Sequence, residues 1–223
     1  MKRIVLFTAG CLLGACCFLT GCPSDTAVHK ASVAAASIGV SLQTAATTNH
    51  QMIQAGEESA TEGALVAGYI DQAAKANDAF SRVLAATPDT GSKLTAQQVL
   101  DAFNVLQQQI AILNTQGVLH LKSAKAQQAF ASVMLSIQGS IAAVELVIAA
   151  NQPQSSIPKS LPLLAIALTP AEIEELIALA LAAGSALVTK LESLRGQTDA
   201  QLQTSALASD AAAEEQAEAD EKI

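Results

Sequence analysis

The chain has 223 residues, a formal net charge of −8 and a hydrophobic fraction of 51%, much of which is Ala. It has no Trp and a single Tyr, a composition that is typical of an all-helical protein. An acidic chain is repelled by the phosphate backbone of nucleic acid, so the charge argues against a nucleic-acid partner.

Residues 1–21 have the composition of an export signal. Lys2 and Arg3 form a short positive start, and residues 4–19 are uncharged and largely apolar. The run Leu19-Thr20-Gly21-Cys22 resembles the lipobox of bacterial lipoproteins. The resemblance implies that the signal peptide is removed and that diacylglycerol is linked to the thiol of Cys22. It also implies that the new amino end can carry a further fatty acid, such as palmitate.

Two alternatives to this interpretation are an ordinary cleaved signal and an uncleaved membrane helix. A second, weaker lipobox, Leu13-Gly14-Ala15-Cys16, would leave a shorter apolar stretch, so Cys22 is preferred. In Gram-negative lipoproteins, the absence of Asp after the acylated Cys implies the outer membrane. We therefore expect the periplasmic face of the outer membrane rather than the inner membrane, although Pro23 is unusual at that position and weakens this expectation.

Cysteine chemistry is confined to the anchor. Cys11, Cys16 and Cys17 lie within the removed segment, so only Cys22 survives. The mature chain can therefore form no internal disulfide, and lipidation of Cys22 leaves no thiol for nucleophilic, metal or redox chemistry. The mature chain also has no uninterrupted apolar run of the length that spans a bilayer, so we expect the lipid to provide the anchor.

Two long stretches without Pro follow, 26–87 and 95–150. We predict that each is mainly helical and that they pair as a long antiparallel hairpin, about 90 Å long at about 1.5 Å per residue. In the first stretch, apolar or small residues recur at alternating spacings of three and four, as a helix seam requires. These residues are Val28, Ala31, Ala35, Ile38, Leu42, Ala45, Asn49 and Met52, and then Val66, Tyr69, Ala73, Ala76, Phe80 and Val83. Because Gly56, Ser59 and Gly63 keep the same phase, we favour one long helix over two helices broken near Gly56.

The second stretch opens with a capping-box pattern, in which Thr95 and Gln98 can satisfy each other's backbone amides. It contains two seams whose phases differ by one residue, so we predict a kink between Asn114 and Ala124, with Gly117 as the best candidate. The first seam is Val99, Phe103, Leu106, Ile110 and Leu113, and the second is Phe130, Met134, Ile137, Ile141, Val144 and Ile148.

Folding the chain at Pro88-Asp89-Thr90-Gly91, a good turn sequence, matches opposite charges across the hairpin. Arg82 comes opposite Asp101, and Glu58 and Glu62 come opposite Lys122, Lys125 and His120. Coincidence among so few charges is the alternative explanation. Between residues 95 and 150 the only formal charges are Asp101, Lys122, Lys125 and Glu145. Such a sparsely charged surface suggests cover by a second copy, giving a homo-oligomer, or by another envelope protein.

A third helix is predicted at 170–195, because Thr169, Pro170 and Glu172 form a strong helix start. The connector 152–168 before it is too apolar for an exposed loop, and we expect it to cap the bundle base or to contact lipid. Within a helical domain of residues 22–196, these elements complete an all-α fold. Residues 197–223 form an acidic Ala- and Gln-rich tail, for which we expect disorder or a frayed helix.

The search for chemistry finds no catalytic, cofactor or metal site. The three His residues lie far apart in the sequence, and His29 and His50 are interpreted as exposed helix positions. Two groups of neighbouring carboxylates, Glu57-Glu58 and Glu172/Glu174/Glu175, have structural explanations at a helix middle and a helix start. Glu145 is a lone acid in an apolar run, and we favour a solvent-facing or Lys-paired role over a buried functional one.

Two functional hypotheses remain, and neither is an enzyme. The first is a lipid-anchored protein of the bacterial envelope with a structural or protein-interaction role, whose Pro88 turn points away from the membrane. The second is a membrane-active helical protein that inserts the apolar residues 176–188 into a bilayer.

Overall fold

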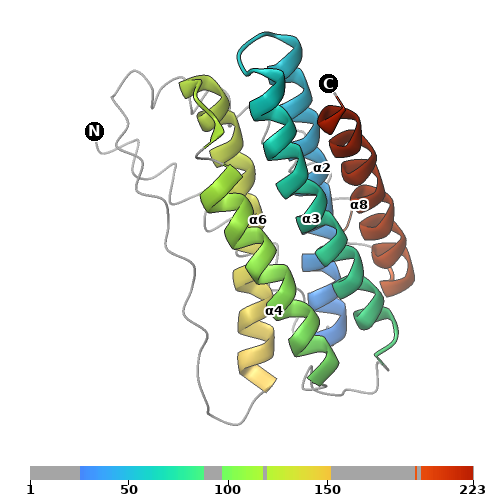
Figure 1. Cartoon of the computed structure of the whole chain (residues 1–223). Helices are drawn as coiled ribbons and strands as arrows, with labels where there is room; N and C mark the ends of the chain where they lie inside the picture. The colour runs from blue at the N-terminus through green and yellow to red at the C-terminus, as the bar shows by residue number, and fades with distance from the viewer. Residues whose placement is uncertain (1–25, 88–96, 118–119, 152–193, 195–196, 223) are drawn as a thin grey trace, which may run out of the picture.

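The computed structural model describes residues 26–87, 97–117, 120–151, 194 and 197–222, and these form an all-helical bundle, as predicted (Figure 1). Its elements are α2 (Ala27–Gln54), α3 (Ala60–Ala85), α4 (Gln97–Ile112), the π-helical turn η1 (Leu113–Gly117), α6 (Ala124–Asn151) and α8 (Asp199–Glu221). The signal peptide, Cys22, the Thr95 cap, the connector 152–168 and nearly all of the predicted third helix lie outside the described residues.

The first stretch contains two helices, so the prediction of one long helix is wrong. Gly56 has φ of 70°, and its N–H donates to the carbonyl of Ile53, while Glu57 N–H donates to the carbonyl of Met52. These two bonds form a Schellman motif, which ends α2. Ser59 then caps α3 through a capping box with Glu62. The chain reverses there. The longest helices, α2 and α6, have 28 residues each and are about 42 Å long, so the predicted length of about 90 Å is wrong.

The fold-back at Gly56 moves the end of α3 to the start of α2. Asn77 Nδ2 donates to the carbonyl of Ala35, and Asn49 Nδ2 donates to the carbonyl of Gly63, so the two helices are antiparallel. In this register Ala85 is level with Ala27. The Pro88 turn itself is outside the described residues. Helix α3, which precedes it in the chain, ends beside the start of α2 (Figure 1). Because Cys22 also lies outside the described residues, the direction of this turn relative to the anchor stays a prediction. Among the described residues, the connection between α2 and α3 lies at the opposite end of the bundle from the start of α2.

Helices α4 and α6 complete an antiparallel four-helix bundle with α2 and α3 (Figure 1). The rings of Phe80 and Phe103 meet between α3 and α4, with centroids 5.5 Å apart. Ser37 and Ser41 of α2 exchange hydroxyl hydrogen bonds of 2.9 and 3.0 Å with Ser140 and Ser136 of α6. Every residue of the two seams predicted for 95–150 is buried, and the helix is interrupted in the predicted interval, where η1 ends at Gly117.

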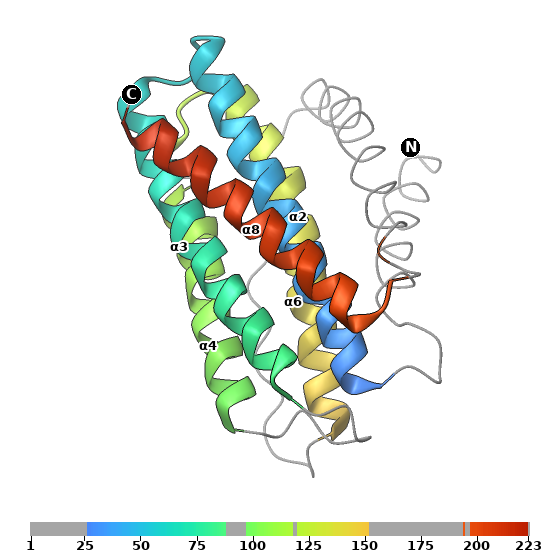
Figure 2. The same ribbon diagram turned by 90° about the vertical axis from the view of Figure 1, so that its right-hand side faces the viewer.

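The acidic tail forms the regular helix α8, so the expectation of disorder or fraying is wrong. α8 lies along both α2 and α3, parallel to α2 (Figure 2). It begins with a capping box between Thr198 and Gln201. Leu202, Ala206, Ala213 and Ala217 are buried against the bundle. Tertiary contacts therefore hold in place a helix that its own charges disfavour.

The charge matching of the predicted hairpin holds at one end and fails at the other. Lys122 pairs with Glu62, as expected, and Lys125 pairs with Glu57 at 3.0 Å. Arg82 pairs instead with Asp78, one turn away on α3, and Asp101 accepts a hydrogen bond from Gln97. The antiparallel register of α3 and α4 is nevertheless the predicted one.

Candidate functional site: a polar seam between α2, α3 and α8

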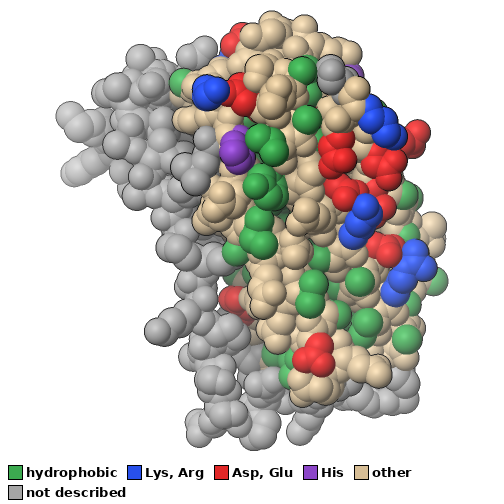
Figure 3. Space-filling model, in the orientation of Figure 1, with side chains coloured by type: hydrophobic (Ala, Val, Ile, Leu, Met, Phe, Trp, Pro, Cys, Tyr) green, Lys and Arg blue, Asp and Glu red, His purple; other side chains and the backbone are tan. Residues whose placement is uncertain are grey.

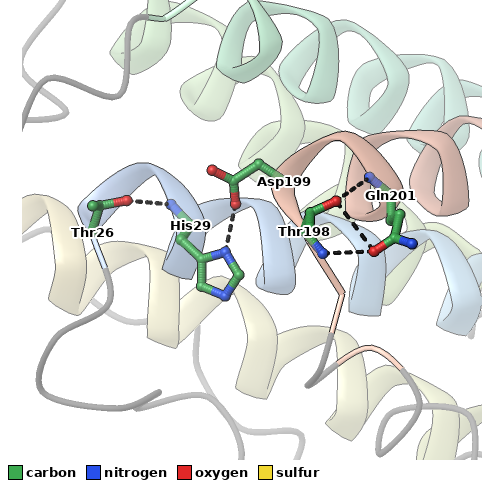
Figure 4. A network of polar contacts seen from close by, with 5 residues as sticks. All are labelled: Thr26, His29, Thr198, Asp199 and Gln201. Atoms are coloured by element: carbon green, nitrogen blue, oxygen red, sulfur yellow. Dashed lines mark hydrogen bonds and ion pairs between the residues drawn. The ribbon is translucent and has the colours of Figure 1, made fainter.

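The only site residue predicted from the sequence, Cys22, lies outside the described residues. The first described residue is Thr26, four positions later, whose hydroxyl accepts the N–H of His29 at 3.1 Å and caps α2 (Figure 4). A lipid on Cys22 would therefore be joined to the bundle by very few residues.

We use the name polar seam for the row of polar contacts between α8 and its neighbours α2 and α3. It runs from His29 and Asp199, through Asn77 and Asp210, to His50, Asn49 and Asp220. One end of the polar seam lies beside the Thr26 cap. His29 Nδ1 of α2 is 2.5 Å from Asp199 Oδ1, the first residue of α8 (Figure 4). Both side chains are partly exposed. Thr198 and Gln201 form the capping box of α8 at the same place. Asp199 thus satisfies two requirements at once, since an acid favours the positive end of a helix and also pairs with the imidazole.

The middle of the seam is occupied by Asp210, which has no exposed surface. Its two carboxylate oxygens accept hydrogen bonds from Asn77 Nδ2 of α3 at 3.1 and 2.9 Å. The pKa of Asp210 is raised to about 8, mainly by burial. The hydrogen bonds from Asn77 oppose this shift, and the neighbouring charges of Asp78 and Glu214 favour it. No cation within the described residues pairs with this carboxyl group.

Gly39 of α2 provides the space for Asp210. A methyl group at Gly39 would lie 3.0 Å from Asp210 Oδ1 and 3.2 Å from the backbone oxygen of Ala206. Both distances are shorter than ordinary contacts, so the absence of a side chain lets α8 approach α2 closely. Gly39 therefore sets the depth at which Asp210 is buried.

The far end of the seam repeats the pairing of His with Asp. His50 Nδ1 lies 2.7 Å from Asp220 Oδ1, and Asn49 Nδ2 donates to Asp220 Oδ2 at 3.0 Å. Asp220 is completely buried, whereas His50 remains partly exposed. Both His residues therefore contact α8 and are only partly exposed, so the prediction that they are exposed helix positions is wrong.

Glu58 lies near this end, in the connection between α2 and α3. It is 5% exposed, and neither carboxylate oxygen has a hydrogen-bond partner among the described residues. Burial, together with the charges of Glu62 and Asp220, raises the pKa of Glu58 to about 7. The sequence places Glu58 opposite Lys122 and Lys125, but in the structure these two Lys residues pair with Glu62 and Glu57.

The other candidate residues are placed apart from the seam. His120 stacks on Tyr69, with ring centroids 6.1 Å apart. Glu145 is partly buried and accepts a hydrogen bond from Gln107 at 2.5 Å, so its partner is an amide rather than the predicted Lys or solvent. Burial raises the pKa of Glu145. Glu172, Glu174 and Glu175 lie outside the described residues.

The polar seam joins α8 to α2 and α3. Within the described ranges, no three His, Cys, Asp or Glu side chains are grouped so that they could hold a metal ion. A search of the same residues finds no helix that is long and apolar enough to cross a membrane. The carboxyl groups of this region whose charged forms are poorly solvated are those of Asp210 and Glu58.

The sequence contains one clue to this site. His29 and His50 are 21 residues apart, and so are Asp199 and Asp220. Equal spacings place both pairs in register when two helices lie parallel, because 21 residues are close to six helical turns. The equal spacing does not predict the contacts by itself, because the sequence does not show which helices are neighbours.

Comparison of the chain with protein-family models, with curated proteins and with solved structures finds no match.

Proposed function

We propose that this protein is a lipid-anchored helical bundle of the bacterial cell envelope that works through protein contacts rather than catalysis. The observation that carries the proposal is the short distance along the chain between the lipobox Cys22 and Thr26, the cap of α2. A bundle attached in this way stands directly on the bilayer. One acyl chain gives only marginal attachment, whereas two or three, at about 0.8 kcal/mol per buried methylene, hold it stably. The periplasmic face of the outer membrane is the location that we propose.

The direction of the helices supports an orientation for the anchored bundle. The start of α2, the end of α3, the start of α4 and the end of α6 lie together (Figure 1). This end would face the lipid. The opposite end carries the α2–α3 connection and the two ion pairs made by Lys122 and Lys125, and it would point away from the membrane.

The outer surface of α4 and α6 is the best candidate for protein contacts. Most charged side chains gather over α3 and α8, whereas the α4 and α6 surface shows few (Figure 3). Val105 and Ile112 of α4 and Leu135 of α6 are exposed there. The partner can be a second copy of the chain or another envelope protein. Crosslinking from Val105 in native envelopes, followed by mass measurement, would distinguish these two.

The anchor can be tested with a matched pair of variants. In a Gram-negative host given an alkyne-labelled fatty acid, Cys22→Ala should abolish labelling and leave the signal uncleaved. Cys16→Ala, which alters only the weaker lipobox, should leave both unchanged. Labelling that survives in Cys22→Ala, or is lost in Cys16→Ala, would contradict the proposed anchor.

The membrane-active alternative predicts a different result. The segment that would insert, 176–188, is outside the described residues. No feature of the described helices favours membrane insertion. Release of dye from liposomes by the chain carrying Cys22→Ala would support the alternative. Absence of release, together with crosslinks to envelope proteins, would support the interaction role.

A further inference from the structure

Helix α8 is attached to the bundle by unusual contacts. Among its buried residues only Leu202 is a large apolar side chain, and the others are Ala206, Ser209, Asp210, Ala213, Ala217 and Asp220. The core between α2, α3, α4 and α6 is built instead from Phe, Ile, Leu and Val. Because the free energy of burial scales with the apolar area removed from water, α8 gains less from burial than the other helices do. Polar contacts therefore contribute a larger part of the free energy that holds α8 on the bundle than they do for the other helices.

Three carboxyl groups of α8 point into the bundle at its start, middle and end. Asp199 meets His29, Asp210 meets Asn77, and Asp220 meets His50 and Asn49. Asp210 has only an uncharged amide as its partner, so its ionised form is the least compensated of the three.

The charged groups around Asp210 do not compensate it either. On α3, Lys75 is engaged by Asp71 and Arg82 is engaged by Asp78. On α8 itself, Glu214 and Glu218 lie at the same edge, and the charge of Glu214 disfavours ionisation of Asp210. On α2, the charged or titratable groups that face α8 are His29 and His50 at the two ends of the seam. Alkaline solution therefore adds negative charge to an interface that has no free cation among the described residues.

The acidic residues of α8 also disfavour its return once the helix has left the bundle. Between Asp199 and Glu221 it has seven acidic residues and no basic one, and several acids lie in its last turn. Acids at the carboxyl end oppose the helix dipole, and like charges three or four residues apart repel. A released α8 with ionised carboxylates is thus a poor helix and does not rebind readily.

We propose that α8 is a pH-responsive latch, which closes the groove between α2 and α3 in mildly acidic solution and opens progressively as the solution becomes alkaline. The burial of Asp210 beside Gly39 and Asn77 is the element that couples the latch to protons. Opening exposes the small-residue face of α2 and α3 that α8 covers. The proposal does not depend on the lipid anchor.

The test is amide hydrogen exchange of the full-length chain in detergent between about pH 5 and pH 8.5, corrected for the intrinsic pH dependence of exchange. The equilibrium constant for opening of α8 should rise, by up to about tenfold per pH unit for each proton released. The amides of α4 should keep their protection over the same range. Protection of α8 that is independent of pH, or that falls together with that of α4, would overturn the proposal.

Variants assign the effect to one carboxyl group. Asp210→Asn keeps the shape of the side chain and removes its charge, so it should flatten the pH dependence of α8 opening. Glu215→Gln removes an exposed acid of the same helix and should leave the dependence as in the natural chain. Asp210→Leu provides the same test if the Asn variant does not fold. A dependence that persists in every Asp210 variant would refute the role of this residue.

Discussion

His50 Nδ1 lies 2.7 Å from Oδ1 of Asp220, a residue with no exposed surface that is separated from it by 170 positions in the chain. His29 and Asp199 are separated by the same number of positions and make the same contact at the other end of α8. Two such contacts fix both the direction and the register of α8 along α2. The acidic carboxyl-terminal segment is therefore a structural part of the bundle.

Removal of residues 197–223 should destabilise the bundle. Deletion exposes the apolar face that Leu202 and its neighbouring Ala residues cover, and burial of one Leu side chain alone is worth about 1.5 to 3 kcal/mol. We expect the free energy of unfolding, measured by urea denaturation and circular dichroism, to fall by at least about 2 kcal/mol. A truncated chain of unchanged stability would show that α8 is an unattached tail.

Glu58 should make the bundle more stable in acid than at neutral pH. Its pKa in the folded chain is about 7, above the ordinary value of 4.5, because burial disfavours the carboxylate. The folded state therefore holds a proton that the unfolded state has lost between these two values. Stability from this group is fully present below about pH 4.5 and is lost as the pH rises through about 7.

Glu58→Gln removes this titration. We expect it to raise the free energy of unfolding at pH 8 by about 1 to 3 kcal/mol and to change it little at pH 4.5. Glu57→Gln is the matched control, because Glu57 is more exposed and pairs with Lys125. An equal effect of both variants at pH 8 would contradict the special position of Glu58.

Gly39→Ala should loosen α8. The added methyl group would lie 3.0 Å from Asp210 Oδ1 and 3.2 Å from the backbone of Ala206, so α8 must move outward. We expect a loss of about 1 to 3 kcal/mol in urea denaturation. Gly139→Ala in α6 is the control, since nothing lies within 4 Å of its added methyl group. That control should gain up to about 1 kcal/mol from helix propensity, and a loss in both variants would argue against the close approach at Gly39.

Gly56→Ala distinguishes the observed break from a continuous helix by the sign of its effect. Gly56 has φ of 70°, a conformation that costs an L-residue about 1 to 2 kcal/mol. The substitution should therefore lower the free energy of unfolding by about that amount. In one uninterrupted helix the same change would raise it by about 1 kcal/mol.

Periodicity predicted the core residues well and the helix boundaries less well. Leu106, Ile110 and Ile137 are buried where the spacing places them, because any helix that packs must bury its apolar stripe. The break at Gly56 escaped prediction because the short connection returns the chain to the same apparent phase. Its local markers are Gly56 itself and the capping box Ser59-Ala60-Thr61-Glu62, which was present in the sequence.

The sequence by itself determined the helical class, the seams and the lipobox that predicts an anchor at Cys22, because these depend on local spacing and residue type. Only the tertiary structure decided that the first stretch folds back, that α8 docks and that His29 and His50 meet Asp199 and Asp220. Local rules disfavour an acidic helix without a basic carboxyl end. Packing against Gly39 and Asn77 overrides them, because contacts between distant segments form only when the whole bundle is assembled.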